Sequence, residues 1–186
     1  MSEFKYPTEM VELPSKGLVY PESNPLSSGE VEMKYMTARE EDILTNQNYI
    51  QDGTVIEKLL KSLIVSKVKY DDLVVGDRNA IMVAARVLGY GQDYVFNFLG
   101  QEKTVDLSKV DSKYLEEDSI PTKGVNKFKY TLPTTGATIE YKLLTGNDDK
   151  KIRQEIKGLQ KLNKQSSPEI STRLKHMLVS VDGNEE

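Results

Sequence analysis

The residue types that carry out most enzyme chemistry are scarce in this chain of 186 residues. Cysteine is absent and histidine occurs once, as His176. Thiol nucleophiles, disulfides, iron–sulfur clusters and cysteine-based zinc fingers are therefore excluded, and so is any site that needs two imidazoles. A hydrolase triad would have to use His176, but no Gly-x-Ser-x-Gly motif accompanies it. We therefore expect no catalytic residues, and we expect His176 to lie on a helix surface or at a helix interface.

Neighbouring acidic residues are the remaining candidates for binding an ion. They occur as Asp71-Asp72, Glu116-Glu117-Asp118 and Asp148-Asp149. Adjacent acids at a helix start or in a loop rarely converge on one ion, and no calcium-loop spacing is present. The pair of glycines in Gly89-Tyr-Gly91 closes a predicted helix, whereas a dinucleotide fingerprint opens one, and no P-loop lysine motif occurs. The sequence therefore predicts neither a metal site nor a cofactor.

Basic residues are concentrated near the C-terminus of a chain whose formal net charge is −4. They are Lys150, Lys151, Arg153, Lys157, Lys161, Lys164, Arg173 and Lys175. A nucleic-acid interface is one interpretation of this cluster, but no aromatic residues are interleaved with the basic ones. We favour a solvated face or a surface that meets an acidic protein partner.

A second polar group, Arg78, Asn79 and Arg86, lies on a predicted helix that is otherwise apolar. An arginine in such a place pairs with a buried carboxylate, either of the same chain or of a partner. Both alternatives stay open, and Arg78 and Arg86 are therefore candidate partner-binding residues.

The spacing of apolar residues predicts a mixed α+β fold. Helical spacing occupies residues 37–48, 54–64, 78–88, 148–164 and 168–179. Strand-like composition occupies residues 31–36, 94–99, 103–107, 127–132 and 138–143. We therefore expect a helical core, a central antiparallel β portion made of two hairpins, and a C-terminal antiparallel helical hairpin.

Turn-forming residues and changes of period divide the chain into four consecutive portions. Residues 1–30 are rich in proline and glycine, which predicts an extended arm that pairs as an edge strand or wraps a neighbour. Residues 31–92 form a strand plus helical portion, residues 93–145 the antiparallel β portion, and residues 146–186 the helical hairpin and tail.

Several helix ends can be predicted from capping residues. Thr37 with Glu40 three residues later is a capping box. Gly76-Asp77 is expected to cap the third helix and Gly89 to end it. Ser167 is the expected cap of the last helix, with Pro168 at its first position.

Two stretches of the sequence resemble each other. Val31–Thr37 (VEMKYMT) aligns with Ile139–Thr145 (IEYKLLT), matching Glu, Lys and Thr, and Glu40-Glu41 then falls on Asp148-Asp149. A Leu-Pro-x-x-Gly motif precedes each stretch, at Leu13–Gly17 and Leu132–Gly136. One interpretation is convergence, because any strand-to-helix junction favours a capping Thr and early acids. The interpretation we favour is a duplicated unit that provides two similarly shaped docking modules.

A series of motifs in this chain resembles one protein family. The motifs are Leu13-Pro-Ser-Lys-Gly-Leu-Val-Tyr20, Met36-Thr-Ala-Arg-Glu-Glu41, Val75-Gly-Asp-Arg-Asn-Ala80, Leu88-Gly-Tyr-Gly91 and Leu143-Leu-Thr-Gly146. In this order and spacing they resemble the baseplate hub assembly proteins of contractile-tailed, T-even-type bacteriophages, from about Leu13 to Gly183. Some relatives carry a Cys-x-x-Cys knuckle where this chain has residues 96–103, which contain no cysteine.

The resemblance implies a non-enzymatic protein of the phage tail baseplate. It would act in the cytoplasm of the infected bacterium, and would either remain in the hub of the virion or leave as an assembly chaperone. Its partners would be other baseplate or hub proteins, with self-association as a further alternative. A nucleic-acid-binding regulator that uses the basic C-terminal helical hairpin is the second, less favoured hypothesis.

The residues expected to bind partners come from three places. These are the N-terminal arm, the two strand–helix junctions at Thr37 and Thr145, and the polar group of Arg78, Asn79 and Arg86, called the arginine strip below. The expected residues are Leu13, Pro14, Lys16, Gly17, Tyr20, Thr37, Glu40, Glu41, Arg78, Arg86, Thr145, Asp148 and Asp149. No membrane partner is expected. The longest apolar stretch, Ala80–Leu88, is interrupted by Arg86 and is far shorter than the roughly 20 residues that span a bilayer. Residues 1–10 lack the apolar core of a signal peptide.

Overall fold

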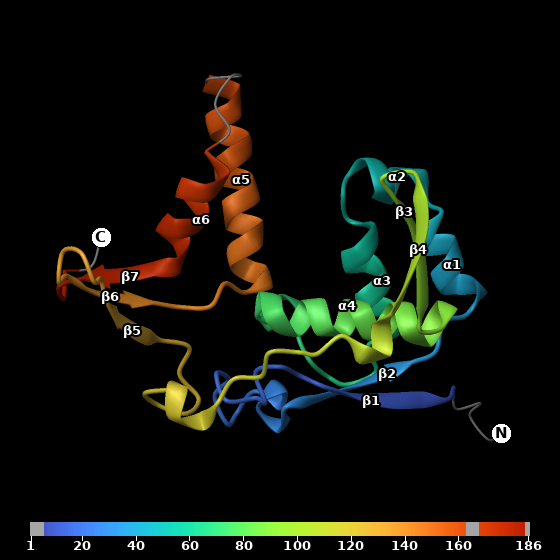
Figure 1. The fold of residues 1–186 in the computed structure, drawn as a ribbon, viewed down its shortest axis with the longest axis horizontal. Coiled ribbons are helices and arrows are strands. Elements are labelled where there is room, and N and C mark those ends of the chain that lie inside the picture. Colours follow the sequence, from blue (N-terminus) through green and yellow to red (C-terminus); the bar gives the residue numbers. More distant parts are fainter. Residues whose placement is uncertain (1–5, 163–167, 185–186) are drawn as a thin grey trace. The chain divides into compact units, whose positions relative to one another are not determined.

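The computed structural model describes residues 6–162 and 168–184, which form an α+β fold (Figure 1). The chain divides into two compact units, each made of separate segments. The first unit comprises Met1–Lys16, Ser28–Val68 and Gly76–Tyr114, and the second comprises Gly17–Ser27, Lys69–Val75 and Leu115–Glu186. This division differs from the four consecutive portions expected from the sequence, because two short segments of the N-terminal half belong to the second unit.

The first unit begins with an antiparallel strand pair, followed by helices and a β-ribbon. The pair is β1 (Thr8–Glu12) and β2 (Glu30–Lys34), in a register that places Val11 opposite Val31. The helices are α1 (Ala38–Leu44), α2 (Gln47–Gln51), α3 (Val55–Leu63) and α4 (Val75–Tyr90). The ribbon is β3 (Asp93–Phe98) and β4 (Gln101–Asp106), followed by the 3₁₀ turn η3 (Leu107–Lys109). The buried apolar residues of this unit are Leu13, Val31, Met33, Leu59, Leu60, Leu63, Ile81 and Ala85.

The second unit contains a three-stranded antiparallel sheet and two helices. Its strands are β5 (Phe128–Thr131), β6 (Thr138–Tyr141) and β7 (Leu178–Val181), with β6 in the middle. Its helices are α5 (Gly146–Leu162) and α6 (Glu169–Met177), and α6 returns along α5 (Figure 1). Three 3₁₀ turns complete the described elements: η1 (Pro25–Ser28), η2 (Tyr70–Asp72) and η4 (Glu117–Ser119). The buried apolar residues of this unit are Leu18, Val19, Tyr20, Leu26, Tyr70, Leu73, Val74, Phe128, Leu144 and Ile152.

Most of the expected helices and strands are confirmed, with differences at their ends. The helix expected at residues 37–48 is two helices, because the side chain of Asn46 caps α2 by accepting from the N–H groups of Asn48 and Tyr49. The expected cap at Gly76-Asp77 is wrong, because α4 begins at Val75, and the expected stop at Gly89 is also wrong. Helix α4 continues to Tyr90, and the left-handed residue that follows it is Gly91, whose φ is +79°.

Three further expectations concern the chain termini and the last helix. The N-terminal arm does pair as a strand, since β1 is hydrogen-bonded to β2. Helix α6 begins at Glu169 with Pro168 as the N-cap, one residue later than expected, and the predicted cap Ser167 lies outside the described residues. The helix also ends at Met177, because residues 178–181 form β7 beside β6.

Candidate functional site

The aligned strand–helix junctions have the same polar network, one in each unit. In the first unit, Glu40 at the start of α1 accepts hydrogen bonds from the backbone N–H and the hydroxyl of Thr37 at 3.0 and 2.6 Å. Its other carboxylate oxygen accepts from Nζ of Lys34 at 2.8 Å and from the hydroxyl of Ser62 at 2.6 Å. All four donors converge on a side chain that has no solvent exposure, so Glu40 joins β2, α1 and α3.

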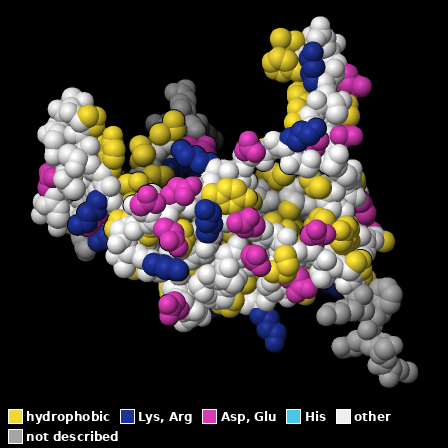
Figure 2. Space-filling view, turned by 60° about the horizontal axis from the view of Figure 1, so that its bottom comes forward, with side chains coloured by type: hydrophobic (Ala, Val, Ile, Leu, Met, Phe, Trp, Pro, Cys, Tyr) yellow, Lys and Arg dark blue, Asp and Glu magenta, His cyan; other side chains and the backbone are white. Residues whose placement is uncertain are grey.

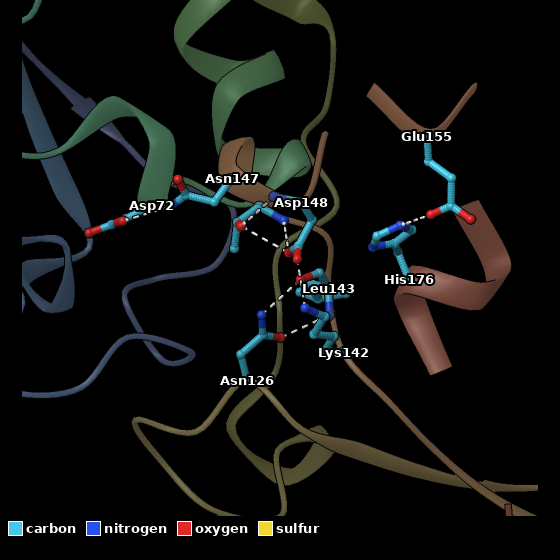
Figure 3. A network of polar contacts seen from close by, with 9 residues as sticks. Asp72, Asn126, Lys142, Leu143, Asn147, Asp148, Glu155 and His176 are labelled. Atoms are coloured by element: carbon cyan, nitrogen blue, oxygen red, sulfur yellow. Dashed lines mark hydrogen bonds and ion pairs between the residues drawn. The ribbon is translucent and has the colours of Figure 1, made fainter. Parts of the chain in front are cut away.

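In the second unit, Asp148 occupies the position of Glu40. One of its oxygens accepts from the backbone N–H and the hydroxyl of Thr145, each at 2.9 Å, and the other accepts from Nζ of Lys142 at 2.7 Å (Figure 3). Asp148 is 5% exposed. Lysine, threonine and acid are thus spaced identically in both units. In each unit, these donors to the acid come from the same unit.

The charged state of both acids is stabilised by these donors. Burial by itself raises the pKa of Glu40, but the hydrogen bonds from Lys34, Ser62 and Thr37 outweigh it and lower the pKa to about 2. Burial likewise raises the pKa of Asp148, and the hydrogen bonds from Lys142 and Thr145 lower it below the ordinary aspartate value. Both acids are therefore anions at neutral pH, which suits a structural ion pair rather than a proton-transfer group.

The repeat extends further than the aligned junctions. In the first unit, Met33 of β2 pairs with Glu9 on one side and forms a bridge to Ile64 on the other, directly after α3. In the second unit, Tyr141 of β6 pairs with Phe128 on one side and Leu178 on the other, directly after α6. Each unit therefore contains a strand pair, a helical segment, and a returning segment that pairs with the second strand on its other side.

Sequence reasoning missed this returning segment, although identical residues mark it. Residues 56–66 and 170–180 share Ile56/Ile170, Leu60/Leu174, Lys61/Lys175, Val65/Val179 and Ser66/Ser180. The final serines have related partners: Ser66 accepts from the backbone N–H of Glu32, and Ser180 donates to the carboxylate of the equivalent Glu140. An alignment of the chain with itself at a separation different from that of the junctions would have found them.

The two Leu-Pro-x-x-Gly motifs also occupy equivalent places. The N–H of Leu13 donates to the carbonyl of Gly29 at 2.8 Å, and the N–H of Leu132 donates to that of Ala137 at 2.9 Å. Each acceptor directly precedes the second strand of its pair, so each motif begins the connection between the two strands. In the first unit this connection is longer by the segment Gly17–Ser27, which belongs to the second unit.

The expected binding surface of the N-terminal arm is largely buried. Leu13 is fully buried, Gly17 is buried, and Tyr20 is 5% exposed with its hydroxyl accepting from the N–H of Val74. Pro14 is half-buried, in a groove that also includes residues of α4, whereas Lys16 is exposed with its ammonium 5.5 Å from the ring of Tyr114. Of the arm residues expected to bind partners, Leu13, Gly17 and Tyr20 are therefore core residues, and Lys16 alone is exposed.

The two acids that follow the buried ones also have partners. Glu41 accepts from the hydroxyl of Tyr90 at 2.8 Å, within the first unit. Asp149 pairs with Arg173 of α6 at 3.1 Å, within the second unit. Thr37 and Thr145 are half-buried, so of the two junctions the exposed Glu41 is the most accessible of the predicted residues.

The arginine strip separates into two environments. The guanidinium group of Arg86 donates to the carbonyls of Gly91 and Asp93 and lies 5.1 Å from the ring of Tyr90 and 5.7 Å from that of Tyr94. It therefore holds the base of the β3–β4 ribbon at the end of α4, a role that neither sequence alternative included. Arg78 is half-buried near the start of α4.

The single histidine and part of the basic cluster form contacts between helices. Nε2 of His176 lies 2.8 Å from the carboxylate of Glu155, which also binds Lys175 at 2.9 Å, so the expected helix-interface position is confirmed (Figure 3). The hydrogen bonds from Lys175 and His176 lower the pKa of Glu155. Lys150 pairs with Asp71 at 2.7 Å. Lys164 lies outside the described residues.

The loop before β5 is joined to the second junction by Asn126. Its side-chain amide donates to the carbonyl of Leu143 at 2.8 Å and accepts from the N–H of the same residue at 2.9 Å (Figure 3). Replacing Asn126 by alanine leaves both backbone groups without this partner, so we expect a loss of about 1–2 kcal/mol in the free energy of unfolding. Urea unfolding measures it, with Asn79→Ala on the exposed face of α4 as the control expected to change little. Equal effects of the two substitutions would contradict a stabilising role for the two hydrogen bonds between Asn126 and Leu143.

The described residues offer neither a metal-binding cluster nor a membrane-spanning helix. The described part of the chain contains no group of three or more His, Asp or Glu side chains placed to hold a metal ion. None of its helices is both long and apolar enough to cross a membrane. Comparison with protein families, with curated proteins and with solved structures finds no match to this chain.

Proposed function

We propose that this chain is a non-enzymatic assembly protein that acts through protein–protein contacts. The observation that carries the proposal is the repeat: each unit contains an antiparallel strand pair followed by the same Lys–Thr–acid network. The lysine, threonine and acid of each network bond to one another and position the helix that follows. A partner would therefore recognise the similar surface shape of the two units and not these polar groups. The sequence resemblance adds a setting for this role, the hub of a phage tail baseplate, in which the protein would be a hub subunit or a hub-assembly chaperone in the infected bacterium.

Equivalent exposed positions on the two units are the places where such docking is best tested. Ile56 of α3 and Ile170 of α6 occupy the same position of the repeat, and they are 40% and 77% exposed. An exposed isoleucine that recurs in both copies offers a partner two similar apolar contacts.

The test uses candidate tail proteins encoded in neighbouring reading frames, co-expressed with this chain and purified as complexes. We expect Ile56→Asp and Ile170→Asp each to weaken a complex by about tenfold or more, and the double variant to abolish it. Val110→Asp, at a residue that is 53% exposed and outside the repeat, is the matched control. A complex that survives the double variant, or the absence of any complex with tail proteins, would argue against the proposal.

A specific observation also favours a second candidate, nucleic-acid binding by α5. Arg153, Lys157 and Lys161 recur every four residues along one exposed side of this helix. DNA or RNA affinity that falls steeply with salt and is lost in Lys157→Ala would favour this candidate, whereas weak binding that is unaffected by the substitution would exclude it.

A further inference from the structure

The β3–β4 ribbon is the most exposed apolar element of the first unit. No other strand of the described residues pairs with either of its strands. Tyr94, Val95 and Phe98 are 45%, 52% and 58% exposed, and Leu99 at the turn is 89% exposed. Figure 2 shows hydrophobic side chains at the end of the narrow projection on its upper right, where the ribbon lies. A two-stranded ribbon of this kind is marginally stable in water unless another element covers it or extends it.

The base of the ribbon is nevertheless held in a defined place. Arg86 donates from its two terminal nitrogens to the carbonyls of Gly91 and Asp93, at 2.9 and 3.3 Å. The rings of Tyr94 and Phe96 stack with their centroids 5.8 Å apart. A ribbon that is fixed at its base presents the same edge each time it meets another protein.

The two edges of the ribbon differ in how well they are protected. Natural sheets guard exposed edges with charged side chains, proline or bulges. Strand β4 (QEKTVD) has Glu102 and Lys103 in its interior, but β3 (DYVFNF) has no charge after Asp93 and no proline. Beyond Asp93, whose carbonyl accepts from Arg86, the edge of β3 is therefore open to pairing, and that of β4 is not.

The register shows which backbone groups face outward. The turn Leu99-Gly100 is closed by the pair Phe98 and Gln101, and Val95 lies opposite Thr104. Bonded and non-bonded pairs alternate along an antiparallel ladder, so counting from the closing pair makes Val95 and Thr104 a non-bonded pair. Their N–H and C=O groups thus point away from each other, Val95 toward the open edge and Thr104 toward the protected one.

We propose that β3 pairs antiparallel with β3 of a second copy of this chain, around a two-fold axis at Val95. In this register Val95 faces its own counterpart, Tyr94 lies opposite Phe96 of the second copy, and Asp93 lies opposite Asn97. No like charges meet, a carboxylate faces an amide, and aromatic side chains pack across the new seam. The corresponding β4 pairings, centred on residues 102, 103 or 104, all place like charges opposite each other.

The consequence is a closed dimer with a four-stranded sheet. Its two outer edges are both β4, which the charged side chains protect, so pairing stops at two copies and no filament grows. Self-association of this kind goes beyond the proposed assembly role and does not depend on it.

The experiment is sedimentation equilibrium of the purified chain over a wide range of concentrations. We expect a monomer–dimer equilibrium for the unmodified protein. Val95→Lys places two ammonium groups at the two-fold axis and should raise the dissociation constant at least about tenfold. Thr104→Lys, at the opposite position of the same pair, is the matched control and should leave the dissociation constant nearly unchanged.

A second pair of variants separates loss of pairing from loss of the ribbon. Val95→Pro and Thr104→Pro each remove an outward N–H and keep the hydrogen bonds between β3 and β4. We expect only Val95→Pro to abolish the dimer, with the far-ultraviolet circular dichroism of the two variants alike. A protein that stays monomeric at every concentration, or a dimer weakened equally by changes on both edges, would overturn the proposal.

Discussion

Replacement of Glu40 by glutamine is expected to lower the free energy of unfolding by about 3 kcal/mol. The substitution preserves the size of the side chain but removes the charge that Lys34 binds, and it turns an N–H group toward donors that surround the carboxylate. Because Glu40 has no solvent exposure and Lys34 is only 15% exposed, water cannot replace the lost interactions. The measurement is urea unfolding at pH 7, compared with the unmodified protein.

The neighbouring acid supplies the control for this prediction. Glu41→Gln changes the same side chain one position later, at an exposed site, and we expect an effect within about 0.5 kcal/mol. Combining Glu40→Gln with Lys34→Met should cost less than the sum of the two single changes, since the double variant leaves no buried charge unpaired. Additive effects, or a loss no larger than that of Glu41→Gln, would show that the buried network is not what stabilises the first unit.

The second large expected effect is a loss of unfolding free energy at acidic pH. The pKa of Glu40 lies at about 2 in the folded protein, below the ordinary value of 4.5, because the hydrogen bonds from its donors outweigh the cost of burial. A group whose folded pKa is depressed stabilises the fold above its ordinary pKa, and this stabilisation is lost as the pH falls toward the folded value. We therefore expect a loss of about 3 kcal/mol from this residue between pH 5 and pH 2.

The same variant isolates the contribution of Glu40 to the pH dependence. Asp148 and Glu155 also have lowered pKa values, so the unmodified protein loses stability in acid from both units. In Glu40→Gln the part due to residue 40 is absent, and its unfolding free energy should approach that of the unmodified protein as the pH falls. A gap between the two proteins that stays constant from pH 7 to pH 3 would contradict the low pKa of Glu40.

Sequence reasoning succeeded where neighbouring residues determine the structure. The cap at Thr37 depends on side chains only a few positions apart, and the helix expected after it is present. The β3–β4 ribbon expected from local composition is also present, with its strands one or two residues from the expected bounds. The α+β class follows from the same local periodicities. The end of α4 was misplaced at Gly89, because two glycines lie two residues apart and only the backbone conformation distinguishes them.

The partner-binding residues were harder to predict because the accessibility of a side chain depends on packing. Leu13 and Tyr20 lie in a segment rich in turn residues, which suggests exposure, yet both are core residues of compact units. The partner of Arg86 could not be read from the sequence either, since the guanidinium group binds backbone carbonyls that any residue would supply. The exposed β3 edge needed both the register of the ribbon and the observation that no described strand covers it.

Composition and local spacing were enough to exclude thiol and two-imidazole chemistry and to locate the start of the repeat. Without cysteine and with one histidine, few side chains remain that could carry out catalysis. The Lys–Thr–acid spacing is visible in the printed sequence because all three residues lie within seven positions. The burial of the two acids within these networks depends on packing, which the spacing does not reveal. Only the tertiary structure decided that Ser62 completes the first network from α3 and that the returning segments at Ile64 and Leu178 complete the repeat. The physical reason is that burial and strand pairing join residues distant in sequence, whereas caps and turns are built from neighbours.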